Sequence, residues 1–102
     1  MNKEESFNAR LRAAIEMCRE LGYHPNRFVQ MLDSIGAVAT ATKLVASGDL
    51  HDGFRELVGR SRADLTMESI MLEPEFASLF TRAQLAAARW RLDQALQPAG
   101  AK

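Results

Sequence analysis

Residues 64–85 read Asp-Leu-Thr-Met-Glu-Ser-Ile-Met-Leu-Glu-Pro-Glu-Phe-Ala-Ser-Leu-Phe-Thr-Arg-Ala-Gln-Leu and contain two predicted helix starts. The first start is Thr66, because its hydroxyl can accept a hydrogen bond from the backbone N–H two or three residues further on. Leu65 and Ile70 have the spacing of a hydrophobic staple around that cap. Pro74 is expected to end this helix, since the residue before a proline is disfavoured in helical backbone angles.

The second predicted start is Thr81, which forms a capping box with Gln84, while Phe80 and Leu85 are spaced as its staple. Between the two caps, Phe76, Leu79 and Phe80 can form a short apolar turn. The last helix is predicted to run over residues 82–97 and to stop at Pro98, and residues 98–102 are expected to be a disordered tail.

The chain before this stretch also has a helical pattern. Apolar residues with a helical spacing follow Ser6, a plausible N-cap, and predict a helix from there to Leu21, with residues 1–5 frayed and Gly22 as a left-handed C-cap. Three more helices are expected at about 25–35, 37–47 and 53–59, with Asp52 capping the last of them. The sequence therefore predicts one all-α domain over residues 6–97, a compact orthogonal array of five to six helices, several of them short, with no sheet.

Composition limits the classes of function. Thirteen basic residues balance thirteen acidic ones in 102 residues, so the excess of Lys and Arg that is typical of general nucleic-acid binders is missing. No apolar run approaches the length of a membrane span, and the polar N-terminus does not resemble a secretion signal. A single cysteine cannot form an internal disulfide. We therefore expect a cytoplasmic protein that does not enter the membrane.

Part of the chain, about residues 23–92, resembles a small all-helical module of uncharacterised bacterial proteins, sometimes found beside restriction-type nuclease domains. The matching residues are Gly36, Val38, Thr40, Ala41, Leu44, Asp52-Gly53-Phe54, Leu57, Arg60, Arg62, Asp64-Leu65-Thr66, Glu68, Leu72, Pro74-Glu75-Phe76, Leu79-Phe80-Thr81, Ala88 and Leu92. The resemblance implies a helical fold and a partner role near DNA, and it supplies no catalytic residues. Val58 stands where the module often has an aromatic residue.

Residues that could support metal binding or catalysis are few. Cys18, His24 and His51 lack the spacing of metal ligands. His51 lies between Asp49 and Asp52 and could act as a general base in a small hydrolase-type enzyme, although the two carboxylates also suit turn and cap positions. No nucleophile motif or phosphate-binding glycine loop is present. We therefore expect no metal, no cofactor and no enzymatic activity.

Two further patterns could contact nucleic acid. Arg60 and Arg62 precede the Thr66 helix start and could hold a phosphate, with Arg55 and Lys43 as additional cations, or they could pair with Glu56, Asp64 or Glu68. Residues 28–46 have the size of a helix-turn-helix, but the second helix offers one basic residue where a recognition helix needs several hydrogen-bonding side chains.

Trp90 is the candidate anchor for a protein partner. Leu85, Ala88, Leu92 and Leu96 define the core side of the last helix, and Trp90 falls about 160° away from them. It shares that far side with Ala83, Ala86, Ala87 and Gln94, unless the helix is buried on both sides. The leading prediction is a non-enzymatic interaction module that binds a protein partner or itself. The alternatives are a nucleic-acid or phosphate-binding accessory domain and, third, the His51 enzyme.

Overall fold

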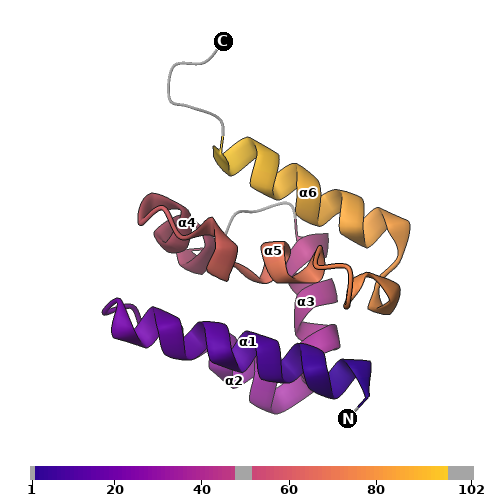
Figure 1. Ribbon diagram of the computed structural model, residues 1–102, viewed down its shortest axis with the longest axis horizontal. Coiled ribbons are helices and arrows are strands. Elements are labelled where there is room, and N and C mark those ends of the chain that lie inside the picture. Colours follow the sequence, from indigo (N-terminus) through magenta and orange to yellow (C-terminus); the bar gives the residue numbers. More distant parts are fainter. Residues whose placement is uncertain (1, 48–51, 97–102) are drawn as a thin grey trace.

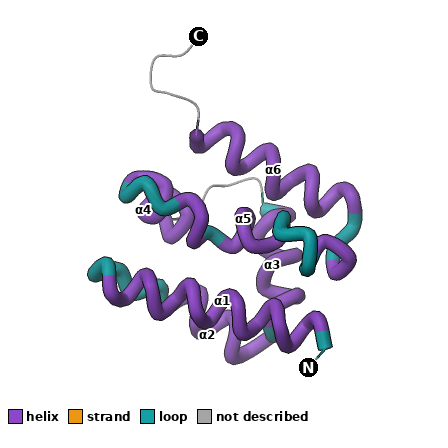
Figure 2. Tube along the Cα trace, in the orientation of Figure 1, coloured by secondary structure: helices purple, strands orange, loops and turns teal. Residues whose placement is uncertain are grey.

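Helices make up most of the computed structural model, which describes residues 2–47 and 52–96, and no residue in those ranges belongs to a strand (Figures 1 and 2). The helices are α1 (Lys3–Glu20), α2 (Asn26–Ile35), α3 (Ala37–Ala46), α4 (Asp52–Gly59), α5 (Met67–Met71) and α6 (Arg82–Leu96), with single 3-10 turns at Ala63–Leu65 and Ala77–Leu79. The predicted all-α class is confirmed. Within the described ranges no helix is long and apolar enough to cross a membrane.

The central helix is α3, which contacts α1, α2, α5 and α6. Figure 1 shows α3 running across the direction of α1 and α6, which lie on opposite sides of it. The short α5 lies against α6 and also touches α1. The predicted compact array of crossing helices is therefore the observed one.

The first helix begins earlier than its sequence pattern predicts. The side-chain oxygen of Asn2 accepts a hydrogen bond from the Glu5 N–H at 2.8 Å, and the Glu5 carboxylate accepts one from the Asn2 N–H at 3.3 Å. This capping box makes Lys3 the first residue of α1, so residues 3–5 form its first turn and are not frayed, and Ser6 lies inside the helix. Lys3 also donates to the Ser78 hydroxyl at 2.9 Å, which ties this turn to the α5–α6 connection.

The end of α1 follows the prediction. Gly22 has a φ of +87°, which glycine adopts without steric cost. The Tyr23 N–H donates to the Cys18 carbonyl at 2.9 Å and the Gly22 N–H to the Arg19 carbonyl at 3.0 Å. These two bonds form the Schellman arrangement, which satisfies the last carbonyls of the helix.

Both helix starts in residues 64–85 are confirmed. The Thr66 hydroxyl accepts from the Ser69 N–H at 3.2 Å and caps α5. The Thr81 and Gln84 side chains accept from each other's backbone N–H at 3.1 and 2.9 Å at the start of α6. The fifth helix ends at Met71, before the expected stop at Pro74, because the chain turns there and the Glu73 N–H bonds to the Ile70 carbonyl at 3.1 Å.

The same stretch supplies much of the core. The ring of Phe7 in α1 lies 5.3 Å from the rings of both Phe76 and Phe80, with tilted and edge-on geometries that favour aromatic pairs. Ile70 and Met71 in α5 are fully buried. The aromatic cluster therefore fixes the α5–α6 connection on α1, and with it the position of α6.

The end of α4 at Gly59 follows the prediction, but the backbone arrangement after it was not anticipated. Ser61, not a glycine, takes the left-handed conformation there, with a φ of +62°. The Arg62 N–H donates to the Leu57 carbonyl at 2.8 Å and the Ser61 N–H to the Val58 carbonyl at 3.0 Å, a second Schellman arrangement. At the other end, Asp52, predicted as the N-cap, is the first residue of α4, and residues 48–51 before it lie outside the described residues.

Candidate functional site

The outer face of α6 carries the one tryptophan of the chain. The Trp90 side chain is 54% exposed, which is the largest exposure among the large hydrophobic residues of the described ranges. Ala83, Ala86 and Gln94 are exposed beside it, and Ala87 is half-buried. Ala88 and Leu92 are buried on the opposite side, as the helical spacing predicts. The helix is therefore covered on one side, and Trp90 faces away from the core.

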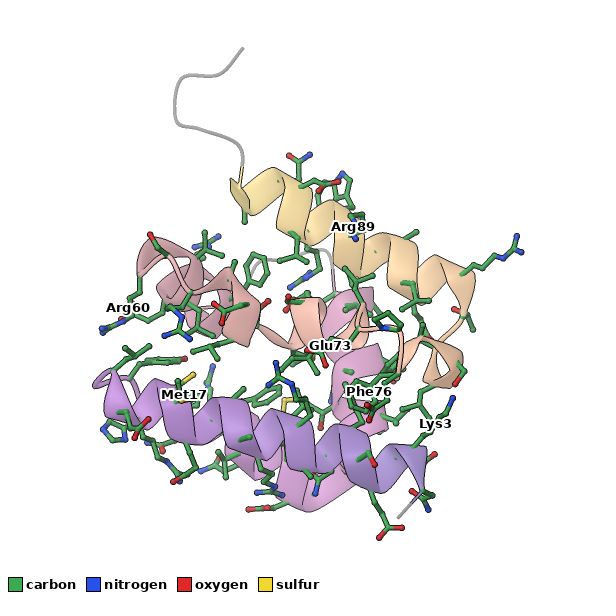
Figure 3. All side chains as sticks on the ribbon, in the orientation of Figure 1. Lys3, Met17, Arg60, Glu73, Phe76 and Arg89 are labelled. Atoms are coloured by element: carbon green, nitrogen blue, oxygen red, sulfur yellow. The ribbon has the colours of Figure 1, made fainter. Side chains whose placement is uncertain are left out.

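Charged residues border this outer face. Arg82 and Asp93 are exposed, and neither forms an ion pair or a hydrogen bond with another residue in the described ranges. At 100° per residue both fall on the same edge of the helix, next to Trp90 and Ala86. Arg89, which Figure 3 labels on α6, is a third exposed charged residue on this side and the second cation. We name the surface formed by Arg82, Ala83, Ala86, Ala87, Trp90, Asp93 and Gln94 the α6 face.

A buried ion pair fixes the inner side of α6. Arg91 Nε donates to Glu68 Oε2 at 2.8 Å, and the two side chains are only 2% and 1% exposed. The guanidinium carbon of Arg91 also lies 5.8 Å from the centre of the Phe54 ring, within range of a cation–π interaction. Sequence reasoning missed this pair and considered Glu68 only as one of three possible partners of Arg60 and Arg62. The signal that could have found it is a charged residue on the apolar side of each helix, Glu68 on α5 and Arg91 on α6.

The Arg60/Arg62 site has its cations already paired. Arg60 lies 2.7 Å from the Glu56 carboxylate and donates to the Leu21 carbonyl at 2.9 Å. Arg62 donates to both carboxylate oxygens of Asp64 at 3.1 Å. The hydrogen bond from Arg62 lowers the pKa of the exposed Asp64 carboxyl, and the same bond raises the pKa of Arg62. A phosphate there would compete with these partners for the guanidinium N–H donors.

The other cations and the helix-turn-helix candidate give no second site. Arg55 and Lys43 are exposed on different helices, α4 and α3. The candidate recognition helix is the central α3, in which Thr40 is fully buried and the Thr42 hydroxyl bonds to the Ala39 carbonyl at 3.1 Å. Little of this helix is therefore available to enter a DNA groove.

The residues considered for metal binding and acid–base chemistry lie in different parts of the chain. Cys18 is buried on α1, and this burial raises the pKa of its thiol, an effect that nearby Arg62 and Arg60 partly oppose. His24 is exposed in the α1–α2 connection. Among the described residues no group of three or more His, Cys, Asp or Glu side chains could hold a metal ion. His51 and Asp49 lie outside the described residues.

The fold and the site define an all-α domain with an exposed tryptophan on its last helix. No family model matches the chain, and neither the curated proteins nor the solved structures contain a significant match. The resemblance to a bacterial helical module found beside nuclease domains stays a prediction.

Proposed function

We propose that this protein is a non-enzymatic helical interaction module that associates with a second copy of itself through the α6 face. The observation that carries the proposal is the 54% exposure of Trp90 among alanines, on a helix whose opposite side is packed. Tryptophan is enriched among residues that dominate binding energy, and small neighbours allow a partner to approach closely. The buried single thiol fits the reducing cytoplasm that we propose as its compartment.

Charge complementarity favours a second copy as the partner. Two α6 helices that pack antiparallel about a two-fold axis, at the level of Ala87 and Ala88, bring Trp90 of one copy beside Ala86 of the other. The same arrangement sets Arg82 opposite Asp93 of the second copy, twice by symmetry. Both charges lack a partner within the described part of one chain. One face therefore supplies an apolar anchor and two matching ion pairs.

The expected dimer is weak. A helix of 15 residues is about 22 Å long, so the α6 face alone is smaller than a standard interface. We expect a dissociation constant weaker than about 1 µM. The test is the molar mass by light scattering from about 10 µM to 1 mM protein at two salt concentrations. Wild type should shift from monomer to dimer, and Trp90→Ala should stay monomeric.

Charge variants test the antiparallel geometry. Asp93→Arg should weaken the dimer, because it places arginines opposite each other, and the Arg82→Glu/Asp93→Arg exchange should restore it. Ile35→Ala is the matched control, since Ile35 is 46% exposed on α2, away from α6, and its loss should leave the mass unchanged. A wild-type protein that stays monomeric throughout, or a dimer lost in Ile35→Ala and kept in Trp90→Ala, would refute the proposal.

A further inference from the structure

A cavity of about 530 Å³ opens between α1, α2, α4 and the segment that leads into α5. Figure 1 shows α4 facing the C-terminal half of α1, and residues of both helices line the cavity. Most wall residues are apolar, among them Ala14 and Ile15 of α1, Phe28 and Met31 of α2, and Phe54 and Leu57 of α4. The volume is in the range of small-molecule sites, which are also mostly apolar.

The polar groups in the inner wall already have partners. Glu68 accepts from Arg91 at 2.8 Å. The Thr66 hydroxyl donates to the Ala63 carbonyl at 2.7 Å and accepts from the Ser69 N–H at 3.2 Å. Cys18 presents a buried thiol. A charged or strongly polar group would lose its hydration inside the cavity and gain little, so the interior suits an uncharged apolar body.

The mouth of the cavity has a different character. The end of the α1–α2 connection and the first turn of α2, residues 23–27, line one edge and contribute His24 and Arg27. Both side chains are exposed, and Arg27 forms no ion pair or hydrogen bond with another described residue. No side chain caps the first turn of α2, which starts beside them at Asn26. An unpaired guanidinium beside the positive end of a helix dipole attracts an anion.

We infer that this cavity binds an amphipathic carboxylate, a small molecule with an apolar chain or ring inside and its carboxylate at Arg27. No described residue of α6 lines the cavity, so this inference is independent of association through the α6 face. A variant that no longer binds the carboxylate can therefore still be tested for self-association, and a variant that no longer associates can still be tested for carboxylate binding.

The test compares three probes with the same chain and different heads: octanoate, 1-octanol and octyltrimethylammonium. Each is titrated below its micelle concentration into the ¹⁵N-labelled protein, and amide shifts are followed by NMR. Octanoate should give saturable shifts in α1, α2 and α4 and bind more tightly than the other two probes. Shifts that do not saturate, or three probes of equal affinity, would overturn the inference.

Two variants locate the site. Ala14→Leu should weaken octanoate binding by occupying part of the apolar interior, with folding checked by circular dichroism. Arg27→Glu, at an exposed position, should weaken octanoate about fivefold and leave octanol unchanged. Arg89→Glu is the matched control, an exposed arginine on α6 that should have no effect. If Ala14→Leu does not fold, the Arg27→Glu result still decides, because equal octanoate affinity in Arg27→Glu and wild type refutes a carboxylate at the mouth.

Discussion

Glu68 and Arg91 are almost completely removed from water, and each compensates the charge of the other. A buried pair of this kind contributes little compared with an apolar pair of the same size. Removal of one partner is costly, because it leaves an uncompensated charge in a medium that solvates it poorly. At this pair a single substitution should therefore lower the free energy of unfolding more than a double substitution that removes both charges.

Glu68→Gln should lower the free energy of unfolding by about 3 kcal/mol, because it removes the carboxylate charge that accepts the hydrogen bond of the buried Arg91 guanidinium. The double variant Glu68→Leu/Arg91→Met should be more stable than Glu68→Gln, since it removes both charges. Urea denaturation followed by circular dichroism measures both. Asp33→Asn is the control, because it breaks the exposed Arg12–Asp33 pair and should cost less than about 1 kcal/mol. Equal losses in Glu68→Gln and Asp33→Asn would contradict this account.

Ser61 is the described non-glycine residue with a positive φ, at +62°. A side chain in the left-handed region costs about 1–2 kcal/mol. Glycine avoids this cost, but part of the gain is offset because glycine loses more backbone freedom on folding than serine does. Ser61→Gly should therefore raise the free energy of unfolding by about 0.5–1 kcal/mol. Ser34→Gly is the comparison, because Ser34 is exposed in the last turn of α2, where it has a helical conformation and glycine should be destabilising. A destabilised Ser61→Gly variant would show that its side chain has another role.

At the scale of single elements, the start of α1 is a case in which the sequence pattern and the structure give different N-cap residues. Both Asn2 and Ser6 have N-cap chemistry, and the structure assigns the cap to Asn2. Asn2→Ala should lower the free energy of unfolding by about 1 kcal/mol. Ser6→Ala should be neutral or slightly stabilising, because alanine is the better residue inside a helix. Thermal unfolding distinguishes the two, and the opposite order would place the functional cap at Ser6.

The elements themselves could be predicted because their signals are local. Thr81 and Gln84 are three residues apart, and Gly22 follows the last apolar residue of its helix, so each signal lies within a single turn. The signal for the start of α1 is also local, but its position was predicted wrongly because two residues, Asn2 and Ser6, both have N-cap chemistry. Ser61 was missed because the left-handed position falls two residues after Gly59, where sequence reasoning expected the helix to end.

At the scale of the whole molecule, the sequence was sufficient to predict the all-α class and the side of α6 that faces away from the core. The Glu68–Arg91 pair joins residues 23 apart, and no local spacing indicates it. The cavity is formed by side chains from five helices, so its existence depends on how those helices cross. The Arg60 and Arg62 partners were among the alternatives, because Glu56 and Asp64 lie four and two residues away.

The buried ion pair also determines the rotational setting of α6 about its own axis. With Arg91 turned inward to Glu68, Trp90, the adjacent residue, must point about 100° away from it. A substitution at Glu68 that lets the helix turn would move Trp90 as well. In a screen of random variants for loss of association, a change at the interior Glu68 would then look the same as a change at the surface Trp90. Such a screen would need a measure of folding beside the measure of association to separate the two.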